Sequence, residues 1–395
     1  MIKEIKKSWK YKTPLQKLTT LYNYVRVSGD YLHLGVLSDQ KLGPIGYIPC
    51  MSGTVHYFLL FYTVYFHISR GRFEECVPSF CIFGIMNAAY TSYMIFWGES
   101  MYVTYRLLNT SRRHIYRDNR ESTKYNQICE ESISYSIKAY GIRMLVIMIS
   151  FVGASAGPFY RYLDDGILVT LYSLKLPYFH DDLHTEFMIN TFWQFFISIY
   201  GGLALFLIEG LLTLIDDTVT VSSNLCLMEF EELSDCLENE SVTIHESREK
   251  LKNVFMKIAY SDEYIKSIGN ILYWRQFLSP PTFSLSIAIS IYSQKMMNYP
   301  AGYGLAVVSY IQMAVMCVMG QNISDRNDRL VTAIYDFKWY LLSKDDQKDV
   351  LHMLLRLQNE VPLTIGPFEE LNFETLKNLS QKVYSFLMFL INFSQ

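Results

Sequence analysis

The last stretch of the chain, Leu379–Gln395, carries residues whose types and spacing suit the passage of ions. From Val383 onward it has no charged side chain, and Phe386, Phe389 and Phe393 recur at steps of three and four residues, beside Asn392. On a helix these residues gather toward one face. Several copies around a symmetry axis would form stacked apolar rings, which block ions by dewetting, with one neutral amide ring near the exit. The same pattern also fits a helix that packs quietly inside a bundle.

This stretch is short for a helix that faces lipid. Its uncharged part spans about 13 residues, or roughly 20 Å of helix, whereas a lone span needs about 20 residues. We therefore expect other helices to surround it.

No residue set typical of enzymatic chemistry accompanies it. The chain shows no GxSxG, HExxH, Walker A or Rossmann pattern. Its seven cysteines include no CxxC and no histidine partner at zinc spacing. The net charge of −3 argues against nucleic acid. We expect neither an enzyme nor a cofactor, a bound metal or a nucleic-acid partner.

The composition favours a membrane protein. Half of the 395 residues are hydrophobic, 15% are aromatic and 18% are charged, below the roughly 25% charged residues of soluble domains. Six uncharged runs precede the terminal stretch, so we predict an all-α fold with seven transmembrane helices. The runs are Pro44–Ile68, Cys76–Gly98, Met144–Tyr160, Phe187–Ile208, Gln276–Gln294 and Met296–Ser324. Pro280 and Pro281 predict a kink or a fresh helix start inside the fifth run.

This organisation divides the chain into three parts: residues 1–324 with six spans and their loops, residues 325–378 as a helical cytoplasmic segment, and residues 379–395 as the seventh helix. In the middle part, Arg326–Leu342 is predicted to extend the sixth helix, so that Tyr335 and Trp339 share one helical face. Ser343 and Asn372 are predicted to cap the following helices. A generic soluble subdomain fits this segment, and so does an oligomerisation anchor below the terminal helices.

Four motifs near the C-terminal end resemble the insect odorant receptor family. They are AIYDFKW at 333–339, LLRLQNEVPL at 354–363, TIGPFEELNFET at 364–375 and VYSF at 383–386. The matching positions are Tyr335, Trp339, Gln358, Pro362, Gly366, Phe368, Leu371, Thr375, Tyr384 and Ser385. Val383 departs from the usual Thr or Ser, and the segment between the fourth and fifth helices is too short for the insertion of the family's shared co-receptor. The chain therefore resembles a ligand-tuned subunit.

The resemblance implies an odorant-gated, weakly selective cation channel in the plasma membrane of a sensory neuron dendrite. Family members assemble as tetramers, usually with the co-receptor, around one pore lined by the seventh helices. Cytoplasmic parts of helices four to seven hold the subunits together. For this chain the implied pore residues are Phe386, Phe389, Asn392 and Phe393, and the implied anchor residues are Tyr335, Trp339, Pro362 and Phe368.

The resemblance also implies a ligand pocket in the outer half of the membrane, between helices two, three, four and six. The residues at those helix ends are Phe83, Met86, Asn87, Tyr90, Ser150, Gly153, Ala154, Gly157, Asn190, Trp193, Ile197, Tyr303, Val307 and Tyr310. None is charged, so we expect a small neutral volatile as ligand. Each also fits an ordinary core position. Gly153 and Gly157 form a GxxxG, which is typical of close helix contact, or which leaves a cavity where side chains are missing.

Two other functions stay open. One is a gustatory receptor of the same superfamily, and the other is a seven-helix receptor or transporter without a pore of its own. A transporter would show internal repeats or charged residues within its spans, and the predicted spans contain neither.

Lys and Arg crowd the N-terminal segment and the loop Arg106–Lys124, so the positive-inside rule predicts a cytoplasmic N-terminus and an extracellular C-terminus. An epitope tag at the N-terminus should therefore stain only in permeabilised cells. Staining of intact cells would contradict this orientation and reopen an arrangement like that of G-protein-coupled receptors.

Overall fold

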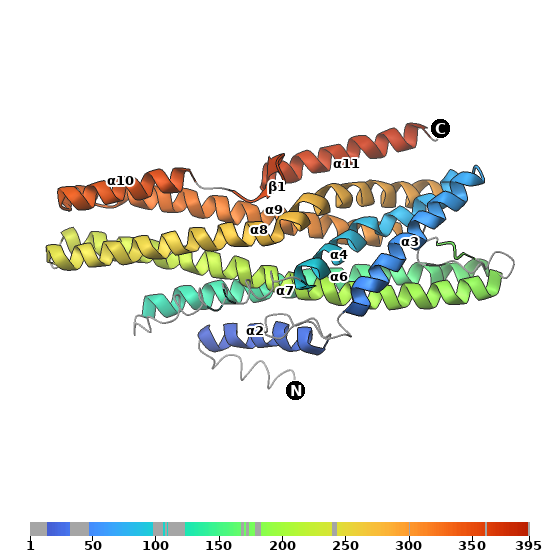
Figure 1. Ribbon diagram of the computed structural model, residues 1–395, viewed down its shortest axis with the longest axis horizontal. Helices are drawn as coiled ribbons and strands as arrows, with labels where there is room; N and C mark the ends of the chain where they lie inside the picture. The colour runs from blue at the N-terminus through green and yellow to red at the C-terminus, as the bar shows by residue number, and fades with distance from the viewer. Residues whose placement is uncertain are drawn as a thin grey trace.

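The protein is a bundle of helices laid along one long axis (Figure 1). The computed structural model describes residues 14–31, 47–97, 106, 109, 123–166, 170, 174–177, 183–238, 243–299, 301–359 and 362–393. Its elements are α2 (Pro14–Tyr31), α3 (Tyr47–Ser69), the 3-10 helix η2 (Phe73–Ile82), α4 (Phe83–Trp97), α6 (Thr123–Asp165), α7 (Leu183–Glu238), α8 (Ile244–Met297), α9 (Gly302–Asp336), η3 (Trp339–Leu341), α10 (Lys344–Gln358), β1 (Thr364–Ile365), β2 (Glu369–Glu370) and α11 (Phe373–Phe393).

The two ends of this bundle differ. α10 lies beside α8 and α9 at one end of the long axis, and α11 finishes at the other (Figure 1). We call these the α10 end and the α11 end. The seven predicted spans correspond to α3, η2 with α4, α6, α7, α8, α9 and α11. Most basic residues that predict the orientation lie outside the described residues.

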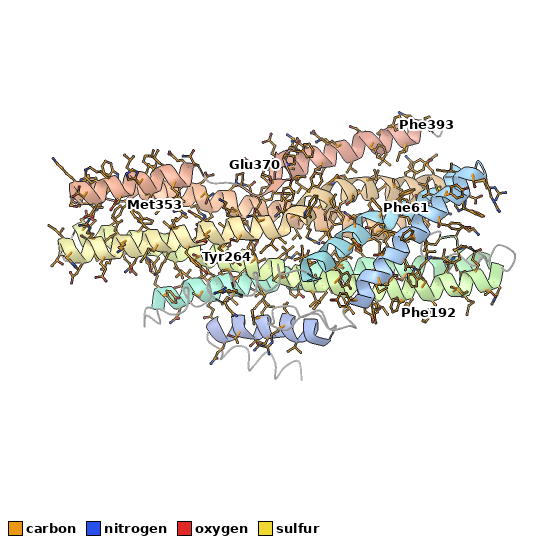
Figure 2. The ribbon with its side chains drawn as sticks, viewed as in Figure 1. Phe61, Phe192, Tyr264, Met353, Glu370 and Phe393 are labelled. Carbon is orange, nitrogen blue, oxygen red and sulfur yellow. The ribbon has the colours of Figure 1, made fainter. Side chains whose placement is uncertain are left out.

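Helix α3 shows how the bundle treats its surroundings. Its polar residues Ser52, His56, Thr63 and His67 are all buried, each at most 7% exposed. Its opposite face is apolar and bare, and Phe61 is 67% exposed. Figure 2 shows Phe61 and, on α7, Phe192 projecting from the outside of the bundle. A helix with polar residues inside and large apolar residues outside suits an apolar solvent, not water.

Three helical segments among the described residues are long and apolar enough to cross a membrane. They are Lys124–Ala156 in α6, His184–Glu238 in α7 and Gly302–Asp336 in α9. The apolar window of the α6 segment is only 11% buried within the chain. α6 therefore presents most of its apolar surface outward, whereas the apolar windows of the α7 and α9 segments are 50% and 61% buried.

The long helices extend well beyond their uncharged runs. α7 continues beyond Ile208, the predicted end of the fourth span, and ends at Glu238. The whole helix has 56 residues and a length of about 84 Å. Because the hydrocarbon core of a bilayer is about 30 Å thick, much of α7 must lie outside it. α8 continues through Pro280 and Pro281, so the predicted fresh helix start there is wrong. The Ser284 hydroxyl donates to the Pro280 carbonyl at 2.9 Å, one turn beyond the Gln276 and Phe277 carbonyls that the prolines leave without helical donors.

A second hydrophobic core lies at the α10 end, separate from the main core. Its buried residues are Cys226, Phe230, Leu233, Leu251, Val254, Ile258, Leu330, Ile334, Phe337, Leu342, Val350, Met353 and Leu357. They come from α7, α8, α9 and α10 together with the link that follows α9. Ser343 caps α10 as predicted, since its hydroxyl accepts from the Asp346 backbone N–H at 3.3 Å.

The predicted shared face of Tyr335 and Trp339 is wrong. α9 ends at Asp336, and Phe337 takes an extended conformation with ψ 138°, so Trp339 starts the separate turn η3. Within the single chain Tyr335 is 58% exposed and Trp339 is 40% exposed. Truncating Trp339 would therefore leave no closed cavity in an isolated chain, and any large energetic role for it requires another subunit.

A short hairpin joins α10 to α11. β1 pairs antiparallel with β2, and Gly366 supplies the left-handed turn with φ 54°. The half-buried Pro362 precedes it, and the Phe368 ring stacks on Phe277 of α8 at 6.1 Å. Asn372 then caps α11 as predicted, accepting from the Thr375 backbone N–H at 2.9 Å.

The start of α11 packs tightly against α9, and a substitution at Gly320 of α9 tests this contact. A Cβ added at Gly320 would lie 1.9 Å from the Leu371 carbonyl oxygen, and backbone cannot swing away as a side chain can. We expect Gly320→Ala to lower the free energy of unfolding by about 1–3 kcal/mol or more, measured as a lower thermal midpoint of the detergent-solubilised protein. Gly141→Ala is the matched control, because a Cβ there meets nothing within 4 Å. Equal midpoints for the two variants would contradict this packing.

Candidate functional site

The predicted pocket residues of α4 and α7 come together around α3. Met86 and Ile197 are buried in one cluster with Leu60 of α3 and Leu174 of the segment before α7. Phe83 and Trp193 pack against it, partly buried. The structure thus joins side chains from two of the four helix ends that the sequence assigned to the pocket.

Two polar side chains of α7 enter this cluster. The Trp193 indole N–H donates to His56 Nδ1 at 3.3 Å, and the Asn190 amide donates to the Leu174 carbonyl at 2.8 Å. Asn190 is 3% exposed, and its side-chain oxygen has no hydrogen-bond partner among the described residues. An unused acceptor in an apolar setting is the kind of group that orients a small hydroxylated molecule.

The other predicted residues of α4 bind neighbouring helices. The Asn87 amide donates to the Thr282 hydroxyl of α8 at 3.1 Å. Tyr90 shares a hydrogen bond of 3.4 Å with Thr54 of α3, and its ring meets that of Tyr57 edge-on at 5.4 Å. These two residues therefore join α4 to α8 and to α3.

The predicted residues of α6 and α9 form a separate contact. A Cβ added at Gly304 of α9 would lie 2.8 Å from the Ser150 carbonyl oxygen and 3.1 Å from Ala154 Cβ. Gly153 is open instead, with nothing within 4 Å of an added Cβ. The close approach of the two helices is therefore made at Gly304, which the sequence analysis missed, and not at Gly153. Gly157 lies in α6, but its surroundings are outside the described side chains.

Three predicted pocket residues of α9 face outward. Tyr303, Val307 and Tyr310 are 60%, 44% and 45% exposed. Their spacing places them on one face of the helix, away from the cluster of Met86 and Ile197. Within the single chain, the predicted set therefore divides into a buried α4–α7 group, an α6–α9 seam and an open α9 face.

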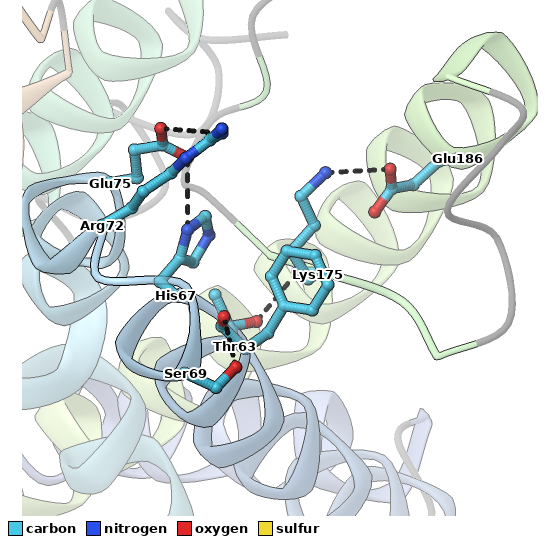
Figure 3. Close-up of polar contacts among 8 residues, drawn as sticks. Thr63, His67, Ser69, Arg72, Glu75, Lys175 and Glu186 are labelled. Carbon is cyan, nitrogen blue, oxygen red and sulfur yellow. Dashed lines mark hydrogen bonds and ion pairs between the residues drawn. The ribbon is translucent and has the colours of Figure 1, made fainter.

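The segment at residues 174–177, which precedes α7, is fastened to α3 and α7 beside the buried α4–α7 group (Figure 3). The backbone N–H of Lys175 donates to the Thr63 hydroxyl of α3 at 2.8 Å. Its ammonium group pairs with Glu186 of α7 at 3.1 Å, and the Leu176 N–H donates to the same carboxylate at 3.3 Å. These contacts hold Leu174 against the cluster.

The turn after α3 carries its own charged group (Figure 3). Glu75 pairs with Arg72 at 3.5 Å, and its carboxylate lies 3.2 Å from Nδ1 of the His67 ring. Because His67 is buried at 2% exposure, the pair closes the last turn of α3 over the polar side of that helix.

The predicted pore residues form an aromatic row on α11. Phe386 is partly buried against the main core. Its ring stacks on Phe389 at 6.4 Å, and Phe389 stacks on Phe393 at 6.0 Å. Phe389 and Phe393 are 60% and 83% exposed, and Asn392 beside them is exposed. Toward the C-terminal end of α11 the row therefore points away from the bundle, and Figure 2 shows Phe393 there.

Buried charges are the feature that the sequence analysis missed most clearly. Glu209 on α7 and Arg275 on α8 are each 1% exposed, and Arg143 on α6 pairs with Glu209. An uncharged run ends at the first charged residue. The fourth run therefore stops at Ile208, one residue before Glu209, and the fifth starts at Gln276, one residue after Arg275. A helical register carried past the run ends would have placed them inside the bundle.

Two open clefts lie between α7 and α9 toward the α10 end. They measure about 510 and 550 Å³ and share Asp328 and Arg329 in their walls. Neither includes a predicted pocket residue. Among the described residues, no group of three or more His, Cys, Asp or Glu could hold a metal ion.

The Thr63 hydroxyl links the covering segment to α3, so removing it should loosen that segment. Thr63→Val keeps the shape and leaves the Lys175 N–H without its acceptor, which costs about 1–3 kcal/mol. We expect faster hydrogen–deuterium exchange in residues 174–177. Thr63→Ser keeps the hydroxyl and should exchange like the parent protein. Unchanged exchange in the valine variant would show that the segment is held without this bond.

Comparison with known proteins gives one family and one fold. Residues 72–384 match the family described as "7tm Odorant receptor". The fold is similar to the solved structure of the insect olfactory receptor OR5 from Machilis hrabei, with 12% sequence identity, a TM-score of 0.69, and coverage of 94% of this chain and 98% of that one. The same receptor in complex with eugenol matches at 12% identity and a TM-score of 0.66, over 95% of this chain and 99% of that one. The predicted all-α fold with seven transmembrane helices is confirmed, and the chain belongs to the 7tm odorant receptor family.

Proposed function

We propose that this multi-pass membrane receptor is the ligand-tuned subunit of a tetrameric, odorant-gated cation channel of the plasma membrane. It works with a co-receptor subunit and is surrounded by lipid. The family match already separates it from enzymes. The observation that carries the channel proposal is the exposed face of α11.

That face does not suit lipid. Tyr384, Ser385 and Asn392 are all exposed: the first two come just before Phe386, and Asn392 comes between Phe389 and Phe393. An amide and two hydroxyl groups at membrane depth would lose hydrogen bonds to water if lipid covered them. Around a symmetry axis the same groups would face a water-filled path, while the rings of Phe389 and Phe393 narrow it.

The ligand proposal follows from the buried α4–α7 group. Met86, Ile197 and Trp193 supply apolar surface, and Asn190 supplies an unused hydrogen-bond acceptor. A small, neutral molecule with a hydroxyl group fits this chemistry. The eugenol bound by the related receptor is such a molecule. The α6–α9 seam and the outward row of Tyr303, Val307 and Tyr310 are the remaining parts of the proposed site.

The anchor proposal rests on exposed aromatic residues at the α10 end and on the link to α11. Tyr335, Trp339 and Phe368 are each at least 40% exposed in the single chain, and large apolar surface outside the membrane favours contact with another protein. Pro362 sets the chain direction just before the hairpin. We propose that residues 325–378 hold neighbouring subunits together and so fix the spacing of residues 379–395.

The channel proposal predicts effects at the end of α11. Phe393→Ala shrinks an apolar ring and lowers the cost of keeping the constriction wet, so it should raise the current measured without odorant. Asn392→Asp adds carboxylates to the exit and should raise the permeability to divalent cations relative to monovalent ones. Both are measured by whole-cell recording with a co-receptor, across a panel of neutral volatiles that includes eugenol.

Lys377→Gln is the control, because Lys377 is exposed on an early turn of the same helix, and it should conduct like the parent. If the parent gives odorant-evoked currents while Phe393→Ala and Asn392→Asp conduct without change, α11 does not line the path. No current from the parent with any co-receptor or odorant would count against the channel proposal itself.

A further inference from the structure

A charged network crosses the middle of the bundle and has no role in the function proposed so far. Arg143 of α6, Glu209 of α7 and Arg275 of α8 form it, together with Gln312 of α9. Both Glu209 and Arg275 are 1% exposed, and Gln312 is fully buried. Removing ions from water is costly unless they are paired. Ionisable residues inside a membrane bundle therefore mark a functional site more often than ordinary packing.

Glu209 is held from one side. Arg143 Nη1 lies 3.5 Å from Glu209 Oε2, and the other terminal nitrogen of the guanidinium donates to the Thr213 hydroxyl at 2.5 Å. The Thr213 hydroxyl itself donates to the Glu209 carbonyl at 2.7 Å. This ties α6 to one turn of α7 through a single, rather long ion pair.

Within the described part of the chain, the hydrogen bonds of Arg275 go to neutral acceptors. One terminal nitrogen donates to the Ala88 carbonyl at 3.0 Å and to the Ser92 hydroxyl at 2.6 Å, both on α4. The other donates to Gln312 Oε1 at 3.4 Å. A buried guanidinium thus spends its hydrogen bonds on uncharged acceptors although a carboxylate lies close enough to interact with it electrostatically.

Unused hydrogen-bonding atoms surround the carboxylate. Neither oxygen of Glu209 meets hydrogen-bond geometry with a described residue, and neither does Arg275 Nε nor Gln312 Nε2. Glu209 interacts electrostatically with both arginines, and the Gln312 side chain lies near its carboxylate. The donors on α8 and α9 therefore match the acceptors on α7, and buried groups of this kind are expected to find partners. A second pairing, between Glu209 and Arg275, is available within the same network.

We propose that Glu209 is a positioning residue for gating, which exchanges its ion-pair partner between Arg143 and Arg275 as the receptor changes state. This inference rests on the proposed channel function. One pairing joins α7 to α6, and the other joins α7 to α8 and α9. Because a charged carboxylate that is buried without a partner is costly, the two pairings favour two discrete arrangements of the helices that carry the odorant signal.

The exchange predicts opposite effects of the two arginines. Arg143→Gln leaves Arg275 as the only cationic partner of Glu209, and Arg275→Gln leaves only Arg143. The odorant concentration for half-maximal current should therefore shift in opposite directions in the two variants, by about fivefold or more each, the lower range of typical coupling between sites. In a Glu209→Gln background both shifts should shrink, because the carboxylate that they compete for is gone.

Exposed lysines on the same helices provide matched controls. Lys138→Gln on α6 and Lys266→Gln on α8 remove a cation at exposed positions and should leave the response unchanged. If a glutamine variant does not reach the cell surface, lysine at that position keeps the charge but loses the planar fork of the guanidinium. The two lysine variants should again shift in opposite directions, with smaller size.

Shifts in the same direction, or shifts that persist in the Glu209→Gln background, would overturn the exchange and leave the network a structural brace. The same opposite signs are expected in the affinity of the purified full-length receptor for the most potent volatile of the panel, a readout that needs no current. A parent that binds the volatile but does not conduct would contradict the channel proposal, while the affinity measurements would still decide the exchange.

Discussion

Polar groups at membrane depth must find their partners inside the bundle, because lipid offers them no hydrogen bonds. This constraint explains why α3 turns His56 and Thr63 inward and Phe61 outward. It also explains why Arg275 reaches across to a backbone carbonyl of α4. Hydrogen bonds between helices therefore contribute to which helices lie side by side.

Close approach of helix backbones completes what these bonds begin. Since lipid tails are as apolar as the side chains that they would replace, helices in a membrane gain little from burying apolar surface and associate through tight packing and hydrogen bonds. Gly304 brings α9 against α6, and Gly84 brings α4 against α8, where an added Cβ would lie 2.8 Å from the Thr282 carbonyl oxygen. At the same α4–α8 contact, Asn87 donates to the Thr282 hydroxyl. Small residues and polar residues thus act at the same seams.

The sequence predicts features that depend on neighbours in the chain and misses those that depend on the fold. The spans follow from uncharged runs, and the caps at Ser343 and Asn372 follow from local geometry. These predictions are confirmed. The predicted position of Trp339 on α9 is wrong, because α9 ends at Asp336 and the next residue, Phe337, is extended. Glu209 and Arg275 were missed because a charge ends a hydrophobic run in sequence, although partners on other helices accommodate it in three dimensions.

The candidate site shows the same limit. Met86, Ile197 and Trp193 meet in one cluster, yet no periodicity in the chain indicates that Leu174 would cover them. The exposed residues of α9 (Tyr303, Val307 and Tyr310) and of α11 (Phe389 and Phe393) have their side chains open in the single chain. Their contacts depend on the lipid or the subunits that surround the chain.

Two cores joined by unbroken helices give the fold a way to carry motion along its axis. α7, α8 and α9 each contribute to the main core and to the second core at the α10 end. Because packed interiors resist deformation, a tilt of these helices in one core must appear in the other. The hairpin before α11 belongs to the main core through Leu363 and Ile365, whereas α10 belongs to the second core. The start of α11 is therefore held by the helices that surround the candidate site, while Phe389 and Phe393 toward its far end are exposed.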